Sequence, residues 1–507
     1  MRMSAEDINV TDPIFEWAQR APYAVAIIEG NQVVHYRTLC AAVRHAMAAF
    51  REAGWIPGEV IAISLQDNFA LQLAVSIALA RAGLTQVWLP PSDPLEYRAA
   101  RAQALGVTAV ITDRDEGRLD PIARFAADPG WLAESGVAAA PPDLRVCGTG
   151  RAMIFIQSSG TTGAPKDIVV SHEVELLFAD RNQPASGCLP GERCMFLTGL
   201  RFWTGLTRAL RCLYSGGAVV APPANATTED LLQFIELRRV TLLWCTPMHV
   251  QVLLEAMRGD VPRLPQLRIF RCSSGALPVS SVQQARRQIS PNLAIHYGSN
   301  EAGGIAAAPP ELVARYPDCV GLPLPGIELQ LVDQNDLPVA AGGLGLVRVR
   351  GAGIGPLRML GGATADAAAY KDGWYYPGDV GARNAEGVVF LKGRSDEVMN
   401  FDGIMVGPAE IESVLRRHPA VSDAAAFPLP SRRHQDIPVA AVVLRSAVTM
   451  AELARYCSQH LGNRAPRKLF IVNAIPRSPI GKILRRRLTE LAVAQMSAAG
   501  APARDSG

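Results

Sequence analysis

The chain is 507 residues long, with 49% hydrophobic and 19% charged residues. This composition excludes a disordered or collagen-like chain and fits one large or two to three ordinary domains. Fifty Lys and Arg against 47 Asp and Glu leave a net charge of +3, without a basic run suited to nucleic acid. The N-terminus lacks a secretory-signal pattern, and the longest apolar stretch is interrupted by Gln72 and Arg81. We therefore expect a cytoplasmic protein with no nucleic-acid partner and no membrane span.

The cysteines and histidines show no metal-binding pattern. Nine cysteines are scattered from Cys40 to Cys457 without a C-x-x-C pair, and eight histidines lack the spacing of metal ligands. The cysteines are expected to be reduced core residues. Any metal is expected to arrive with a substrate rather than in a site built from protein ligands.

Short apolar runs alternate with helix-like segments in two successive parts of the chain. In residues 24–115, strands are predicted at 24–28, 60–65, 86–89 and 107–111, with helices at 36–53 and 69–81. In residues 152–300, strands are predicted at 153–156, 218–221, 242–245, 269–273 and 294–297. This rhythm is typical of β-α units around largely parallel sheets. We predict two α/β lobes, one from each part.

The pattern changes near Gly321, after which residues alternate between apolar and polar as in a half-exposed strand. Strands at 328–332 and 346–350 and a turn at 384–387 predict a small antiparallel sheet or β-barrel. A separate α+β unit follows, with helices at 408–417 and 450–461 and strands at 438–444 and 468–472. We predict a large N-terminal domain, residues 1–394, and a small C-terminal domain, residues 397–507.

Residues 158–166 form the most informative segment, which reads Ser-Ser-Gly-Thr-Thr-Gly-Ala-Pro-Lys directly after an apolar run. Small residues let backbone N–H groups approach a polyphosphate, hydroxyls add donors, and Lys166 adds a positive charge. The spacing is not that of a Walker loop, which disfavours a P-loop NTPase. Standing alone, such a segment would indicate only a turn.

Further motifs follow in a fixed order along the chain. They are Tyr-Gly-Ser-Asn-Glu at 297–301, Gly-Trp-Tyr-Tyr-Pro-Gly-Asp at 373–379, Gly-Arg-Ser-Asp at 393–396, Gly403 with Pro-Ala-Glu-Ile-Glu at 408–412, and Pro-Ile-Gly-Lys at 479–482. With the first segment, they resemble the acyl-adenylate-forming superfamily: acyl- and aryl-CoA synthetases, peptide-synthetase adenylation domains and luciferases. The resemblance covers about residues 12 to 490. It implies that a carboxylate attacks the α-phosphate of ATP to give acyl-AMP.

The resemblance also implies roles for the residues around the phosphates. Lys482 would bridge the substrate carboxylate and the α-phosphate as negative charge develops. Glu301 would help to hold Mg²⁺, and Asn300 would donate to the α-phosphate. The β- and γ-phosphates would be held by the first segment, through Ser158, Ser159, Gly160, Thr161, Thr162, Gly163 and Lys166.

The nucleoside and the second reaction step have implied residues as well. Asp379 would accept the ribose hydroxyls with Arg394 nearby, and Tyr297 would stack on adenine. The adenine pocket would be lined by Ser274, Gly275 and Ala276. The family rotates its C-terminal domain between two steps, with Asp396 at the hinge and Gly403 on the loop that would line the thiol channel.

Five positions depart from the usual pattern of the superfamily. Asp167 replaces a glycine, Asn300 and Pro377 replace threonines, Asn400 replaces a frequent lysine, and Phe202 replaces a frequent histidine. Asp167 would place a negative charge close to the polyphosphate. Replacing it with glycine is therefore expected to tighten ATP binding slightly, and the departures leave open whether turnover is reduced.

The residues around position 203 bear on the choice of acid. Amino-acid-activating relatives usually place an aspartate where this chain has Trp203, and an unpaired substrate ammonium would be costly there. The pattern favours an aryl or acyl acid. Arg201 either contacts a polar substituent or faces water.

With no appended carrier domain, the expected acceptor is the pantetheine thiol of coenzyme A or of an acyl carrier protein. Two basic pairs, at 432–433 and 467–468, could attract either acceptor. Three alternatives remain open: an amino-acid adenylating enzyme, a catalytically impaired ATP-binding scaffold, and an enzyme that stops at the adenylate or uses oxygen.

Overall fold

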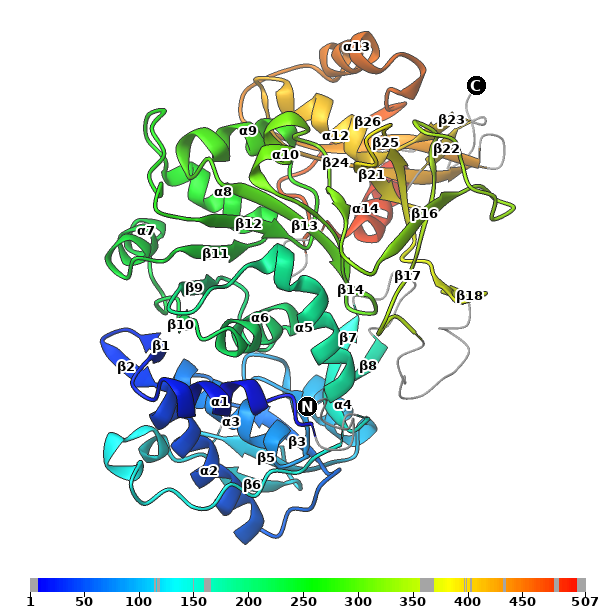
Figure 1. Cartoon of the computed structure of the whole chain (residues 1–507). Helices are drawn as coiled ribbons and strands as arrows, with labels where there is room; N and C mark the ends of the chain where they lie inside the picture. Colours follow the sequence, from blue (N-terminus) through cyan, green and yellow to red (C-terminus); the bar gives the residue numbers. More distant parts are fainter. Residues whose placement is uncertain are drawn as a thin grey trace.

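The computed structural model describes residues 8–113, 115, 119–148, 150–158, 166–355, 369–395, 397, 399–401, 404–431, 435–477 and 483–498. Figure 1 shows the N-terminal lobe in blue, a second sheet in green, and the C-terminal elements in orange and red. Within these residues, no helix combines the length and apolarity needed to cross a membrane. The fold is mixed α/β, as predicted.

The first sheet is parallel except for its last pair of strands. Its order is β6 (Ala123–Ala126), β5 (Val107–Thr112), β3 (Val60–Ser64), β4 (Thr85–Trp88), β7 (Ala152–Ser158) and β8 (Lys166–Ser171). The helices of this part are α1 (Asp12–Arg20), α2 (Tyr36–Glu52), α3 (Phe69–Arg81) and α4 (Leu95–Ala104). Helix α3 begins after Asn68, whose side chain accepts a hydrogen bond from the Leu71 N–H at 2.8 Å.

The second sheet carries the motif at 297–301 and the small-residue segment at 274–276. Its order is β15 (Leu322–Pro323), β14 (Gly303–Ala308), β13 (Leu293–Ser299), β12 (Ile269–Ser273), β11 (Leu242–Cys245), β9 (Arg193–Phe196), β10 (Ala218–Val220), β1 (Val25–Glu29) and β2 (Gln32–His35). Helix α5 (His172–Ser186) follows β8 of the first sheet. The helices that follow strands of the second sheet are α6 (Trp203–Tyr214), α7 (Thr228–Leu237), α8 (Pro247–Ala256), α9 (Val279–Gln288) and α10 (Pro310–Arg315).

Two strands lie in the opposite lobe from the one predicted. Strand β1 pairs in parallel with β10, and Figure 1 shows it beside the green second sheet. Strand β7 pairs in parallel with β4 of the first sheet, with Gln86 opposite Ile154. The prediction of one lobe from each part of the chain is wrong for these strands. Buried parallel strands all read as continuous apolar runs, so local pattern does not identify their neighbours.

A layer of helices separates the two sheets. One apolar cluster contains Leu39 of α2, Leu73 of α3 and Leu206 of α6, together with Ile61 of the first sheet and Phe196 of the second. These side chains are buried. The two sheets therefore share one core, and α6 lies inside it rather than on an outer face.

The third sheet is antiparallel, as predicted. Its order is β18 (Tyr370–Lys371), β19 (Trp374–Tyr375), β17 (Gly345–Arg350), β20 (Asp379–Arg383) and β21 (Val389–Arg394), with β16 (Glu328–Val332) also paired to β17. Among the described strands this pairing path is open. The predicted turn joins β20 to β21, where Gly387 has φ +82° and its N–H donates to the Asn384 carbonyl at 3.0 Å.

The fourth sheet belongs to the smaller C-terminal part. Its order is β23 (Ile404–Val406), β22 (Met399–Phe401), β25 (Gln435–Leu444) and β24 (Val421–Ser431), with β26 (Lys468–Ile471) parallel to β25. Its helices are α12 (Pro408–Arg417), α13 (Met450–Leu461) and α14 (Arg485–Ala498). The pairing changes from the third to the fourth sheet between Arg394 and Met399. The boundary at 394–397 stays a prediction.

Candidate functional site

The carboxyl ends of β11, β12 and β13 bring separate motifs to one edge of the second sheet. The three strands are parallel neighbours. The segment 274–276 follows β12 directly, and Asn300 and Glu301 follow β13. In open α/β sheets, ligands bind outside the carboxyl ends of the strands. The fold therefore places the expected adenine and metal residues at the edge where a ligand is expected.

The loop after β12 offers exposed backbone to a ligand. Ser274 has φ +72°, a left-handed conformation that is uncommon for a residue other than glycine. Ser274, Gly275 and Ala276 are all exposed, and just before them the Trp244 indole N–H donates to the Ser273 hydroxyl at 2.6 Å. This small-residue loop leaves room for a flat ring.

Tyr297, Asp379 and Arg394 come together from two sheets, as the motifs imply. The Tyr297 hydroxyl donates to Asp379 Oδ2, joining β13 to β20. Arg394 lies opposite Asp379 in the ladder of β20 and β21, and its Nη1 is 3.5 Å from Asp379 Oδ1. Burial, together with the Asp379 carboxylate, raises the pKa of Tyr297. Tyr297 therefore stays a neutral donor to Asp379.

Gly378 makes the approach of Arg394 possible. It has φ +80°, and a Cβ built on it would lie 2.7 Å from Arg394 Nη2. Glycine tolerates this backbone conformation without strain. The Gly-Asp pair at 378–379 is therefore explained by the geometry as well as by the resemblance.

Replacing Asp379 with asparagine is expected to raise the KM for ATP on the order of 10-fold to 10²-fold. A hydrogen bond to a charged group contributes about 1.5–3 kcal/mol, and the amide removes the charged acceptor for the ribose. Steady-state kinetics at varied ATP measures the effect, with exposed Asp372→Asn as the control. An unchanged KM would show that the ribose hydroxyls bind elsewhere.

Asn300 links the end of β13 to the base of the phosphate segment. Its Nδ2 donates to the Gln157 carbonyl at 2.9 Å, one residue before the end of β7. Ser158 and Lys166 lie opposite each other where β7 meets β8, so the segment between them connects an antiparallel pair. One amide hydrogen of Asn300 is therefore committed to positioning this loop, and the other can serve a phosphate.

Glu301 lies near the hydroxyl of Tyr375 on β19. Burial raises the pKa of Tyr375, and the Glu301 carboxylate adds to this shift. The Tyr375 hydroxyl also accepts from the Ser299 hydroxyl at 3.4 Å. A carboxylate is a hard oxygen ligand of the kind that Mg²⁺ prefers.

Asp167 is paired with a cation, which removes the basis for the prediction that it weakens ATP binding. Its Oδ1 accepts from Arg101 Nη2 at 2.6 Å and Nε at 3.0 Å. The two side chains are 17% and 11% exposed, so the pair is largely shielded from water. Asp167 thus brings little uncompensated charge toward the polyphosphate.

Replacing Asp167 with glycine is instead expected to lower the free energy of unfolding by about 2 kcal/mol. Breaking a buried ion pair costs about 3–5 kcal/mol, whereas an exposed ion pair contributes less than about 1 kcal/mol. The burial of the Arg101–Asp167 pair lies between these two cases. The KM for ATP should change less than about twofold. Denaturant unfolding of Asp167→Gly, Arg101→Met and the double variant tests the pairing, because the two losses should not add. Additive losses would contradict it.

Several expected residues lie outside the described part of the chain. These are Ser159, Gly160, Thr161, Thr162, Gly163, Asp396, Gly403 and Lys482. For Ser158, Lys166 and Asn400 the backbone alone is described. Their roles stay predictions.

Arg201 lies at the surface and contacts residues of its own chain. Its Nη1 is 3.5 Å from Asp93 Oδ1 and donates to the Ser92 hydroxyl at 3.3 Å. Arg201 is therefore held by its own chain at the surface. Trp203, the first residue of α6, is buried.

Sequence reasoning missed a group of buried arginines beside this site. We call Arg208 and Arg211 of α6 and Arg271 of β12 the arginine cluster. Arg211 Nη2 lies 3.1 Å from Glu175 Oε2, and Arg208 lies over the Trp244 ring at 3.7 Å. The signal was the sequence Thr-Arg-Ala-Leu-Arg within an otherwise apolar helix, but the sequence did not show that both arginines face inward.

His296 lies beside the arginine cluster and is held neutral. Its Nε2 is 2.8 Å from Asn182 Oδ1, which fixes Nε2 as the donor. Burial lowers the pKa of His296 well below its usual value, and Arg208 and Arg271 lower it further. The face behind Tyr297 is thus strongly positive without the imidazole.

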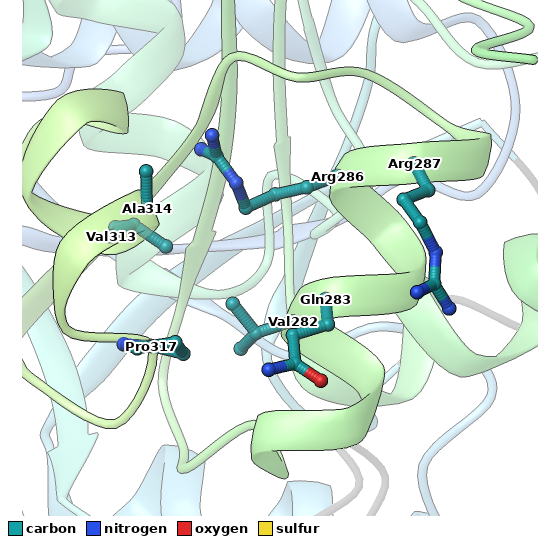
Figure 2. A pocket seen from close by; sticks show the side chains of 7 residues that line it. All are labelled: Val282, Gln283, Arg286, Arg287, Val313, Ala314 and Pro317. Carbon is teal, nitrogen blue, oxygen red and sulfur yellow. The ribbon is translucent and has the colours of Figure 1, made fainter.

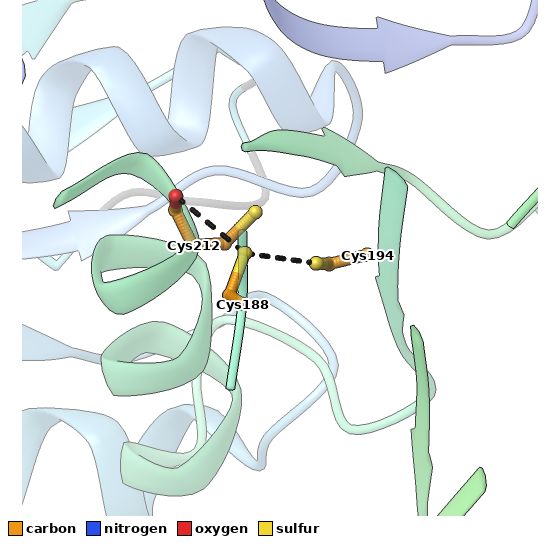
Figure 3. Close-up of side chains that lie close together, drawn as sticks. All are labelled: Cys188, Cys194 and Cys212. Carbon is orange, nitrogen blue, oxygen red and sulfur yellow. Dashed lines mark hydrogen bonds between the residues drawn. The ribbon is translucent and has the colours of Figure 1, made fainter. Parts of the chain in front are cut away.

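Three of the cysteines lie close together in the structure. All of the chain's cysteines except Cys147 are buried, as expected of core residues. Figure 3 shows Cys188, Cys194 and Cys212 together, with the first two sulfurs 3.3 Å apart. Within the described residues these thiols could hold a metal ion, a site that the sequence spacing did not predict. Hydrogen bonds from the other thiols lower the pKa of Cys188 to about 5.

A surface hollow of about 470 Å³ lies between α9 and α10 (Figure 2). It is lined by Val282, Gln283, Arg286, Arg287, Val313, Ala314 and Pro317. None of the site residues named above contributes to it. The hollow is therefore separate from the candidate active site.

Comparison with known proteins identifies the family of the chain. The family model for AMP-binding enzymes matches residues 14–356, and the model for their C-terminal domain matches residues 410–482. The 4-coumarate–CoA ligase 5 of Oryza sativa subsp. japonica is 27% identical, over 95% of this chain and 94% of its own.

Two solved structures share the fold. ATP-bound MatB from Rhodopseudomonas palustris has a TM-score of 0.86 at 20% identity, covering 96% of this chain and 99% of its own. The o-succinylbenzoate coenzyme A synthetase MenE from Bacillus subtilis, in complex with ATP and magnesium ion, has a TM-score of 0.83 at 23% identity, covering 94% and 98%. The chain therefore belongs to the AMP-binding enzymes of the acyl-adenylate-forming superfamily.

Proposed function

We propose that the chain activates an aryl or acyl carboxylic acid with ATP and Mg²⁺, and then transfers the acyl group to a pantetheine thiol. A carboxylate reacts poorly with a thiol, because its leaving group would be oxide. Attack on the α-phosphate releases pyrophosphate and forms a mixed anhydride whose leaving group is AMP. The observation that carries the proposal is the joining of Tyr297 to Asp379, with Arg394 alongside, at the carboxyl edge of the second sheet.

The described residues have distinct parts in binding ATP. Asp379 would accept the ribose hydroxyls, and Tyr297 with the loop at 274–276 would hold adenine. Asn300 would hold the phosphate segment in place through Gln157. Glu301 would supply one oxygen ligand to Mg²⁺, whose bound ion offsets phosphate charge.

The surroundings of the acid favour an aryl or acyl acid over an α-amino acid. Arg208 and Arg271 are buried close to the loop at 274–276, and Trp203, also buried, stands where an ammonium partner would be expected. A substrate ammonium would meet like charge without a carboxylate dedicated to it. An amino-acid adenylating enzyme is therefore the weaker alternative.

Coenzyme A is the acceptor that we favour. The relative with the stated 27% identity is a CoA ligase that this chain matches over nearly its full length. Arg467 belongs to one of the two basic pairs expected to attract an acceptor, and its guanidinium carbon lies 4.6 Å from the centre of the Phe401 ring. This contact does not favour one acceptor over the other. An acyl carrier protein remains the alternative acceptor.

A panel of aryl, fatty and amino acids tests the proposal by acid-dependent pyrophosphate release, with and without coenzyme A. Release with an acid, followed by thioester formation with coenzyme A, is expected. Release without any thioester on coenzyme A or a pantetheinylated carrier protein would favour an enzyme that stops at the adenylate. Binding of ATP without release for any acid would favour the impaired scaffold.

A further inference from the structure

The arginine cluster gathers three buried cationic side chains that interact electrostatically with one another. Arg208, Arg211 and Arg271 are 8%, 6% and 4% exposed. Glu175, fully buried on α5, is the carboxylate that pairs with the cluster, through Arg211 Nε at 3.2 Å and Nη2 at 3.1 Å. Its Oε1 also accepts from the Thr207 hydroxyl at 2.6 Å. The Glu175 carboxylate is therefore already committed to α6.

Arg208, on α6, has buried donors that are not satisfied among the described residues. In the part of the chain that the structure describes, its Nε and Nη1 are buried and have no hydrogen-bond partner. Its guanidinium carbon lies 3.7 Å from the centre of the Trp244 ring, a cation–π contact that offsets only part of the cost of burial. Burial lowers the pKa of Arg208, and Arg211 and Arg271 lower it further.

Two other buried arginines, Arg81 and Arg181, donate to oxygen acceptors. Arg81 Nε donates to Asp143 Oδ1 at 2.7 Å, and its Nη1 donates to Thr11 Oγ1 at 2.8 Å and to Asp12 Oδ1 at 3.1 Å. Arg181 Nη1 donates to the Ala302 carbonyl at 2.8 Å. A buried guanidinium group can thus be fully paired in this fold, and the two open donors of Arg208 are suited to an anion.

The arginine cluster lies directly behind the expected nucleotide site. Trp244, under Arg208, donates to Ser273, the residue before the loop expected to line adenine. Trp244 and Arg271 are opposite each other on β11 and β12, so they share one face of the sheet. Trp244 and Arg271 therefore lie on the two strands whose carboxyl ends border the expected nucleotide site.

We infer that the acid substrate carries a second carboxylate, which pairs with Arg208 while the first is activated. This inference rests on the proposed function and names the substrate class as dicarboxylic acids. The guanidinium fork of Arg208 offers parallel N–H donors to a carboxylate, and Arg271 adds positive charge from the neighbouring strand. A monocarboxylate would leave the donors of Arg208 open, and an ammonium would be repelled.

Matched acids test the inference through the specificity for the second carboxylate. Pyrophosphate release is measured with dicarboxylates of three to eight carbons and with monocarboxylates of the same lengths. For the preferred length we expect kcat/KM to be on the order of 10² higher for the dicarboxylate. Arg208→Met should reduce this ratio on the order of 10², and Arg208→Lys should reduce it less. Arg81→Lys, which alters a satisfied buried arginine, should leave the ratio unchanged.

Thermal melting provides a second readout that does not require turnover. The preferred dicarboxylate alone should raise the melting temperature of the wild-type protein more than the monocarboxylate does, and Arg208→Met should abolish the difference. Without ligand, Arg208→Met should melt no lower than wild type, because it removes an unpaired buried charge. A large loss of stability without ligand would instead assign Arg208 a structural role and overturn the inference.

The outcomes separate this inference from the proposed function. Equal kcat/KM for both acid classes, unchanged by Arg208→Met, would overturn the inference and leave acid activation standing. Absence of pyrophosphate release with every acid would contradict the proposed function. In that case, a rise in melting temperature that is specific to the dicarboxylate and is lost in Arg208→Met would still support an anion site at Arg208. If the dicarboxylate gives no such rise, the inference is overturned as well.

Discussion

Lys482→Ala is expected to lower the rate of adenylate formation on the order of 10² to 10³. The Lys482 ammonium would act chiefly as the substrate carboxylate meets the α-phosphate, where two anions must approach. Removing one preorganised donor to a transition-state charge costs about 2.7–4 kcal/mol in other enzymes, which corresponds to this range. Acid-dependent pyrophosphate exchange measures the first half-reaction by itself.

Transfer from a supplied acyl-adenylate to the thiol should largely survive in Lys482→Ala, because that step no longer joins two anions. Arg486→Ala is a matched control: this nearby cation is exposed, and its Nε lies 3.6 Å from Glu490 Oε1. It should leave both half-reactions intact. Equal loss of both steps in Lys482→Ala would count against the role of this lysine in adenylation.

Asp396→Pro is expected to leave pyrophosphate release within about tenfold and to reduce thioester formation by roughly 10² or more. Proline fixes φ at position 396 and restricts Ser395 before it. If the C-terminal part rotates here between the two steps, the variant should be trapped, most readily in the adenylating state. The expected difference corresponds to about 2.7 kcal/mol in the barrier to thioester formation.

The neighbours of this position tie the large and small parts together. The Ser395 N–H donates to the Gly378 carbonyl at 2.7 Å, next to Asp379, and the Glu397 N–H donates to the Arg394 carbonyl at 3.1 Å. Glu397 also lies 3.6 Å from Arg485 of α14. A rotation at this point has to exchange some of these contacts.

Measuring the two half-reactions separately decides whether position 396 is the hinge. Asp396→Ala is the control, since it removes the side chain and keeps the backbone free. Equal and modest losses in both steps for the proline variant would indicate an ordinary turn. An intact thioesterification rate would refute the hinge assignment.

Local pattern in the sequence was sufficient for many elements and for the order of the motifs. The bounds of α3, α12 and α13 agree with the predicted ranges, because apolar periodicity and end signals such as Pro408 are local properties. Strand β24 was not predicted, since its alanines and prolines have low strand propensity. Its long pairing with β25 overrides that propensity.

The resemblance grouped Tyr297, Asp379 and Arg394 around the nucleoside, and the structure brings the three together although β13 and β20 lie far apart in the sequence. Their hydrogen bond and ion pair are tertiary facts, but each residue was marked by a short motif of its own. Small residues such as Gly378 carry this signal because the backbone must allow a close approach.

Only the tertiary structure decided which charges are compensated and which strands are neighbours. The sequence predicted an uncompensated charge at Asp167, whereas in the structure Asp167 pairs with Arg101. The strands β1 and β7 each belong to the sheet opposite to the predicted one. The open donors of Arg208 and the grouping of Cys188 with Cys194 and Cys212 were equally hidden. The physical reason is common to all of them. Residue type and spacing determine local conformation, whereas the electrostatic state of a side chain depends on partners that come close only when the chain folds.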